Sequence, residues 1–212
     1  MVVLPVFLQA PWVHFYPLSA CLFAFLLLSI GLGLIRFRAA KWSNIGSLLV
    51  GVSASWLGGC LFWGWLREYP LFHLPVEAFA LPIAIVGLKQ KWRIGAGFYL
   101  ASLLGTAITD LMMLLTGVIT AWPSIVKASF ANSSELLSTT ANQLINPQSI
   151  LLLVAAAILI LVISNFMKNQ ALLETQSSST WFVASAALST TLWVDGLFLF
   201  TALIQPNFSG LI

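Results

Sequence analysis

Long apolar stretches, separated by short polar connections, dominate the chain. A helix needs about 20 apolar residues to span the hydrocarbon core of a bilayer. Stretches of that length predict about six transmembrane helices, and hence an all-α polytopic membrane helix bundle that forms a single transmembrane domain over residues 1–212. The expected helices cover residues 17–35, 44–66, 71–88, 95–118, 149–167 and 181–204.

Two segments outside these helices differ from the rest. Residues 1–16 contain Pro5, Pro11 and several aromatic side chains. Prolines interrupt helices and aromatic rings favour the membrane–water interface, so we expect an interfacial or re-entrant lead-in. The connection over residues 123–148 is rich in Ser, Thr and Asn, and we expect it outside the membrane on the non-cytoplasmic side, with a short surface helix at residues 124–137.

Composition agrees with the membrane class. Hydrophobic residues make up 60% of the chain, charged residues only 7%, and the mean hydropathy is +1.00. Soluble domains contain roughly 25% charged residues. The net charge of +3 therefore does not indicate nucleic-acid binding, and the lipid bilayer is the first expected partner.

Several chemistries lack their sequence signatures. The chain contains no GxSxG, P-loop, HExxH or dinucleotide-binding motif, so we do not expect an enzyme. Cys21 and Cys60 lie in apolar segments without metal-binding spacing, so neither a disulfide nor a metal site is expected. The nine tryptophans fit an interfacial belt, although a pigment or quinone pocket would use the same side chains; no cofactor is assigned.

The basic residues predict the orientation in the membrane. The connections after the first, third and fifth helices contain seven of the nine Lys and Arg residues, and the opposite side contains two. Cytoplasmic loops are enriched in Lys and Arg, so both termini are expected outside the cytoplasm. The seven are Arg36, Arg38, Lys41, Lys89, Lys91, Arg93 and Lys168; the two are Arg67 and Lys127.

Three carboxylates, Glu77, Asp110 and Asp195, lie inside the predicted transmembrane helices. A charge in the hydrocarbon costs roughly 2.5–3.5 kcal/mol even on lenient insertion scales, so each acid needs a partner, a cavity or a function. At the rise of an α-helix per residue, Glu77 lies roughly 18 Å, Asp110 roughly 25 Å and Asp195 roughly 21 Å from the cytoplasmic end of its helix. All three therefore belong to the non-cytoplasmic half and can form one polar layer.

The neighbours of the acids extend this candidate site. A threonine precedes each aspartate by one helical turn, and a histidine lies one turn from Glu77. Glu77 also lies between Pro75 and Pro82, which predicts a broken or distorted helix of the kind that lines binding sites in transporters. The expected substrate- or ion-binding residues are Glu77, Asp110, Asp195, Thr106, Thr191, His73 and Arg67.

A purely structural interpretation fits the same residues. Glu77 or Asp110 could pair with Arg67 or His73 and lock the helices together without binding any ligand. A metal-ligand role for His73 is disfavoured, because Glu77 is its one obvious neighbouring ligand. The sequence leaves open a structural lock and a site for a proton, a cation or a polar substrate.

Small residues recur every four positions in two of the predicted helices. Such faces let helix backbones approach closely, so we expect both helices to pack tightly, with each as a candidate partner of the other. The two stripes are Ser47, Gly51, Ser55 and Gly59, and Gly97, Ala101 and Gly105.

Four stretches resemble a known family. They are FWGWL at 62–66, HLPVEAFALP at 73–82, FYLASLLGTAITDL at 98–111 and VDGLF at 194–198. They look like segments of a cyanobacterial family of integral membrane proteins classified as a domain of unknown function. The resemblance implies a cyanobacterial origin and a thylakoid or plasma membrane location, and it supplies no activity. The connection and the predicted helix over residues 149–167 carry no matching motif.

Two functions from different classes remain. In the first, the chain is a small transporter or a membrane-embedded binding subunit, and its acids bind a proton, a cation or a small polar substrate. In the second, it is an accessory or assembly factor of a photosynthetic membrane complex, and its acids are structural. The first has a small molecule or ion as its partner, and the second has a membrane-protein complex. The spread of polar residues over three helices favours the first.

Overall fold

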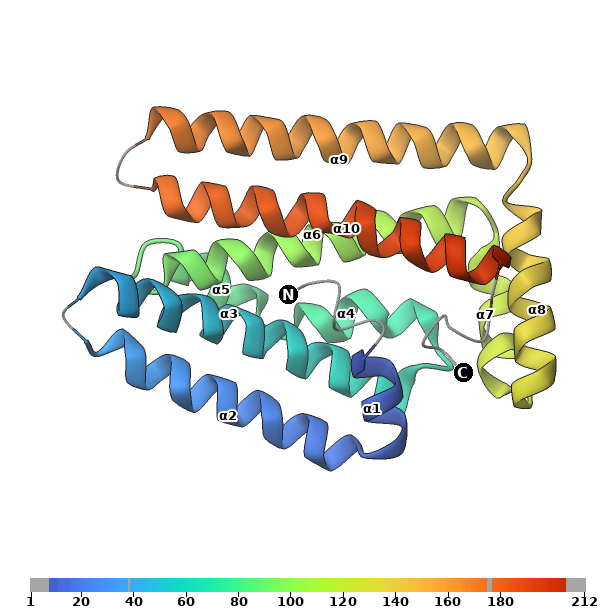
Figure 1. The fold of residues 1–212 in the computed structure, drawn as a ribbon, viewed down its shortest axis with the longest axis horizontal. Coiled ribbons are helices and arrows are strands. Elements are labelled where there is room, and N and C mark those ends of the chain that lie inside the picture. The colour runs from blue at the N-terminus through green and yellow to red at the C-terminus, as the bar shows by residue number, and fades with distance from the viewer. Residues whose placement is uncertain (1–7, 38, 175–176, 205–212) are drawn as a thin grey trace.

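The computed structural model describes residues 8–37, 39–174 and 177–204, and every regular element in these ranges is a helix (Figure 1). Six helical segments are long and apolar enough to cross a membrane. This confirms the predicted all-α polytopic bundle. The segments are Pro17–Ile35 (α2), Ala40–Leu66 (α3, Ala40–Leu61, and the π-helix η2, Phe62–Leu66), Pro70–Gly87 (η3, α4, η4 and α5), Arg93–Leu115 (α6), Pro147–Leu173 (α9) and Ser178–Ile204 (α10).

The largest difference in length concerns α9, which was expected to end at residue 167 and continues to Leu173. The prediction stopped where the apolar stretch meets Lys168. The residues that follow are good or neutral helix formers, so the helix continues after its hydrophobicity has fallen. Its polar end extends beyond the segment that the hydrocarbon requires.

The third membrane segment is broken, as the two prolines predicted. It consists of the 3₁₀ turn η3 (Pro70–Phe72), the helix α4 (His73–Glu77), a second 3₁₀ turn η4 (Ala78–Ala80) and the helix α5 (Leu81–Gly87). Pro82 has no N–H to donate to the carbonyl four residues before it, and the chain tightens to 3₁₀ geometry at this point.

Among the described residues, three further α-helices lie outside the six membrane segments. Within the lead-in, α1 (Ala10–Phe15) is helical, while Pro5 lies outside the described residues. The expectation of one surface helix at residues 124–137 is wrong: the structure has α7 (Val118–Lys127) and α8 (Phe130–Gln143) instead. Ala128 and Ser129 are extended between them, which ends one helix before the other begins.

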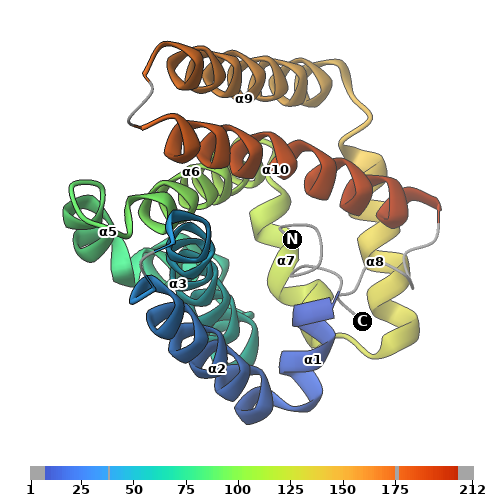
Figure 2. The same ribbon diagram turned by 60° about the vertical axis from the view of Figure 1, so that its left-hand side comes forward.

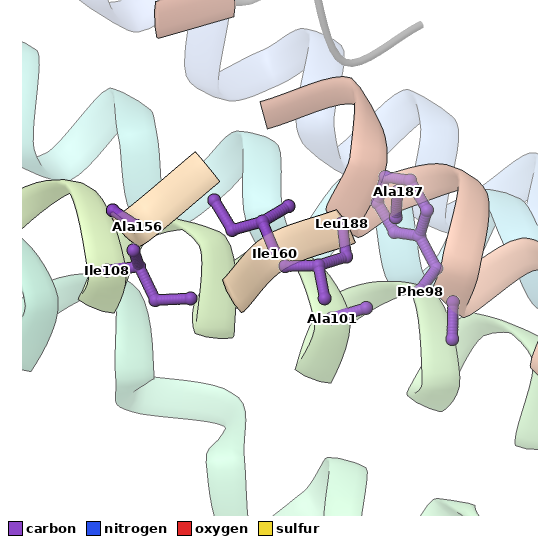
Figure 3. Close-up of a cluster of buried hydrophobic side chains, with 8 residues drawn as sticks. Phe98, Ala101, Ile108, Ala156, Ile160, Ala187 and Leu188 are labelled. Carbon is purple, nitrogen blue, oxygen red and sulfur yellow. The ribbon is translucent and has the colours of Figure 1, made fainter. Parts of the chain in front are cut away.

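The long helices pack both on the next helix along the chain and on helices distant in sequence. α2 packs on α3, α3 on α6, α6 on α10, and α10 on α9 (Figures 1 and 2). In both views α7 and α8 run across one end of this bundle, at the end of α6 that follows Asp110. Figure 3 shows the largest core cluster, in which Phe98 and Ile108 of α6, Ile160 of α9 and Leu188 of α10 interlock.

Glycine allows α3 and α6 to approach each other closely. A Cβ atom placed on Gly95 of α6 would lie 1.9 Å from the Ser47 carbonyl oxygen of α3, and one on Gly51 would lie 2.2 Å from the Gly95 carbonyl oxygen. The Gly95 N–H also donates a hydrogen bond of 2.9 Å to the Ser47 hydroxyl. Ser47 and Gly51 of the expected small-residue stripe therefore do pack on α6, whereas Gly59 of the same stripe faces Gln9.

The second expected stripe has a different partner. Gly97 faces Thr180 and Gly105 faces Thr191, and both threonines belong to α10. Gly95 and Gly97 lie on opposite sides of α6, because two residues rotate a helix by roughly 200°. One side of α6 therefore approaches α3 and the other approaches α10, so this helix is the centre of the bundle.

Gly95→Ala is expected to lower stability, because the new methyl group would overlap the α3 backbone. Overpacking of this kind costs about 1–3 kcal/mol. Gly33→Ala is the matched control, since a Cβ atom at Gly33 meets nothing within 4 Å. The thermal unfolding midpoint in detergent should fall for the first variant and stay or rise for the second. Equal midpoints would contradict the packing.

The arrangement brings the connections with most of the basic residues to the same end of the bundle, opposite α7 and α8 (Figure 1). Which end faces the cytoplasm stays a prediction. In a background with Cys21 and Cys60 replaced by alanine, Glu135→Cys on α8 should react with a membrane-impermeant maleimide on intact cells. Lys91→Cys should react only after permeabilisation. The reverse pattern would refute the predicted orientation.

Candidate functional site: a histidine between two intramembrane carboxylates

The structure brings three of the expected site residues into direct contact. The His73 Nδ1 atom lies 2.8 Å from the Asp110 Oδ1 atom, and the His73 Nε2 atom lies 3.4 Å from the Glu77 Oε1 atom. His73 and Glu77 share α4, one turn apart, while Asp110 comes from α6. A single imidazole therefore joins a carboxylate of its own helix to one of the neighbouring helix.

The geometry of this cluster limits which of its atoms can carry a proton. Ionised carboxylates only accept hydrogen bonds, and a neutral imidazole has one N–H to donate. Both nitrogens of His73 face carboxylate oxygens. A hydrogen bond at each ring nitrogen therefore requires either a doubly protonated ring or a protonated carboxyl.

Threonine hydroxyls connect the cluster to the rest of the polar layer. The Thr106 hydroxyl donates to the Glu77 Oε2 atom at 2.9 Å, across the α4–α6 interface. Thr106 was expected beside Asp110 on its own helix. Instead it orients the carboxylate of the other helix.

Asp195 joins the layer through a residue that was not among the expected site residues. The Thr109 hydroxyl donates to the Asp195 Oδ2 atom at 2.6 Å, which links α6 to α10. The available signal was the position of Thr109 directly beside Asp110, on the neighbouring face of the same helix. Thr191, which was expected in this role, packs against Gly105.

Arg67 lies apart from the acids. Its Nη1 atom is 2.8 Å from the His14 Nδ1 atom of α1, and its backbone carbonyl accepts a hydrogen bond of 2.8 Å from the Trp122 indole. Partial burial lowers the pKa of His14, and the Arg67 charge lowers it further, so a neutral imidazole can accept the guanidinium N–H. In the structure Arg67 thus ties the lead-in and α7 to the end of η2 (Phe62–Leu66).

The Tyr99 hydroxyl holds the broken helix in place beneath Glu77. It donates to the Glu77 carbonyl and accepts a hydrogen bond of 3.1 Å from the Ala80 N–H. These are backbone groups at the 3₁₀ turn, where regular helical bonding is interrupted. On the other side, a Cβ atom at Gly58 would lie 3.1 Å from the Glu77 Cα atom, so α3 also supports this position closely.

The cluster is not sealed by protein. The side chains of His73, Glu77 and Asp110 are 21%, 19% and 18% exposed. Asp195 and Thr109 also line a cavity of about 300 Å³. The carboxylate layer therefore borders space that a small molecule can occupy.

Metal binding has no support in the part of the chain that the structure describes. There, no group of three or more His, Cys, Asp and Glu side chains is arranged to hold a metal ion. What the geometry shows is a cluster in which one histidine contacts two carboxylates.

These features define a multi-pass membrane protein with a histidine–carboxylate cluster inside its helix bundle. The chain belongs to the family described as "Protein of unknown function (DUF3120)", which matches residues 1–203. The resemblance noted in the sequence is thereby confirmed at the level of an integral membrane family of unknown function. Neither the curated proteins nor the solved structures contain a match.

Removing the Tyr99 hydroxyl should destabilise the broken helix. Tyr99→Phe leaves a backbone carbonyl and an N–H without this partner, at a cost of about 1–3 kcal/mol. Tyr69→Phe is the matched control, because Tyr69 is exposed. Thermal unfolding in detergent should show a lower midpoint for Tyr99→Phe alone; identical midpoints would show that the hydroxyl does not stabilise the turn.

Proposed function

We propose that this protein is a small integral membrane transporter, or the membrane-embedded binding subunit of one. His73, Glu77, Asp110 and Asp195 form its proton- or cation-linked site. The observation that carries the proposal is the charge of the layer: one histidine contacts two acids, the third acid is bonded to Thr109, and Arg67 contacts His14 instead.

The charge sum favours a binding site over a lock. With the acids ionised and the histidine protonated, the layer carries −3 + 1 = −2. A surplus charge in the membrane is costly unless a proton or cation compensates it. An efficient structural lock would pair its charges evenly, because one unpaired buried charge costs more than the pair gains.

Because the cluster lies between helices, binding of a proton or cation to it would change how strongly these helices attract each other. The His73–Asp110 contact joins the broken segment to α6, and the Thr109–Asp195 bond joins α6 to α10. At an effective dielectric constant of about 20, two charges 4 Å apart interact with about 4 kcal/mol. A change in the protonation of one member therefore alters the attraction between α4 and α6. α4 is five residues long and lies between 3₁₀ turns, so a small displacement breaks few helical bonds.

The alternative is an accessory or assembly factor of a photosynthetic membrane complex, with structural acids. The cross-helix hydrogen bonds favour this alternative, since they connect three helices. The surplus negative charge and the adjoining cavity favour transport. On the resemblance of the stretches at 73–82 and 98–111, we propose a cyanobacterial thylakoid or plasma membrane as the location for either function.

Charge movement can test the site without a known organic substrate. Proteoliposomes on a solid-supported membrane are exposed to steps in pH, Na⁺ or K⁺, and the transient current is recorded. We expect a current from the native protein for at least one of these steps, reduced at least tenfold by Asp110→Asn. Glu135→Gln, which changes an exposed acid of α8, should leave the current unchanged.

Two results would contradict transport. One is a native current no larger than that of protein-free liposomes in all three steps. The other is a loss of folded protein on Asp110→Asn, with unchanged current per molecule in what remains. Together with co-purification of a large complex, the second result would establish the accessory role.

A further inference from the structure

We propose that the cavity beside the carboxylate layer binds a small amphipathic amine, with Asp195 as the counter-ion of its ammonium group. This inference rests on the proposed function and names the substrate class of that same site. The evidence for it is the position of the cavity, its lining residues and its charge, and the acids alone would not suggest it.

The cavity lies where α7 and α8 cross the end of the long helices. It has a volume of about 300 Å³ and is enclosed by residues of α6, α7, α8, α9 and α10. Pockets for small organic molecules begin at about this size and are mostly apolar. The apolar lining includes Ile108, Met112, Leu137, Leu153, Ile160 and Leu199.

One charged side chain lines the cavity among the described residues, and it is Asp195. Thr109 donates a hydrogen bond to its Oδ2 atom, which fixes the carboxylate at the cavity wall. No described residue donates to Oδ1, and the lining contains no Lys, Arg or His from the described part of the chain. The potential is therefore negative, so a cationic group is favoured and an anionic one excluded.

The two ends of the cavity differ in chemistry. Asp195 lies roughly 10 Å along α10 from Ala202, by the rise of an α-helix. Ala202 packs in an apolar cluster with Ile125 of α7 and Leu137 of α8. A ligand with its ammonium group at Asp195 would direct an apolar body of several carbon atoms toward these two helices.

The cover over the cavity is anchored to the rest of the protein. Lys127 at the end of α7 forms an ion pair of 3.2 Å with Glu68, and the Trp122 indole donates to the Arg67 carbonyl. Trp122 itself lines the cavity. The aromatic and aliphatic wall at this end is thus held in position, as a binding pocket requires.

Binding can be measured with a matched pair of probes, 4-phenylbutylamine and 4-phenylbutanol. They share the apolar body and differ in charge at neutral pH. Isothermal titration of the full chain in nanodiscs, against empty nanodiscs, should give a Kd at least tenfold lower for the amine. 5-Phenylpentanoate, the anionic analogue, should show no saturable binding.

Three variants separate the contribution of charge from that of space. Asp195→Asn should remove the preference for the amine over the alcohol. Gly196→Leu should weaken both probes at least tenfold, because Gly196 lines the cavity and a Cβ atom there meets no other atom within 4 Å. Gly33→Leu is the matched control on α2, with the same open surroundings, and should bind like the native protein.

The outcomes are distinguishable from those of the ion-step experiment. Equal affinity for amine and alcohol would identify a neutral or lipid-chain pocket and overturn the inference, as would saturable binding that survives Gly196→Leu. If Asp195→Asn fails to fold, the Gly196→Leu and Gly33→Leu pair still decides whether this cavity is occupied. Ion-step currents without amine binding would leave the proposed function intact and refute the inference alone. Amine binding without currents would support the pocket and refute transport.

Discussion

The cost of charge in a membrane governs the arrangement of this protein. Glu77 and Asp110 lie in membrane-spanning segments, and His73 between them forms a hydrogen bond with Asp110 and a 3.4 Å ion-pair contact with Glu77. To make these contacts, α4 has to lie against α6 at a defined height. The Thr106 hydroxyl donates a hydrogen bond to Glu77 and the Thr109 hydroxyl donates one to Asp195, so hydrogen bonds connect the carboxylate layer across three helices.

Close backbone approach makes this layer possible. Lipid tails are as apolar as leucine, so helices in a membrane associate through packing and hydrogen bonds. Gly51 and Gly95 bring α3 and α6 into backbone contact, while Gly105 lets α10 approach the other side of α6. α6 is therefore fixed on both sides, and the Tyr99 hydroxyl on this same helix supports the interrupted turn that carries Glu77.

The layer and the cavity form one functional region. The cluster around His73 is connected to Asp195 through α6, and Asp195 lines a largely apolar cavity together with residues of α7 and α8. A carboxylate beside an apolar pocket is suited to a ligand that is itself part apolar and part cationic. The surplus of negative charge gives the same region a reason to bind protons or cations, and this connects the proposed transport with the proposed ligand.

The sequence by itself determined the membrane class, the positions of the spans and the break around Pro82. The length of an apolar stretch and the position of a proline each determine the structure of their own segment. Their effects can therefore be predicted without knowing how the helices pack. Only the tertiary structure decided that Thr109, rather than Thr191, meets Asp195, that Arg67 turns to His14, and that two helices replace one after α6. These outcomes depend on which faces of separate helices meet. A rotation of roughly 100° per residue turns a neighbouring position toward a different partner, and the packing of glycines sets that rotation.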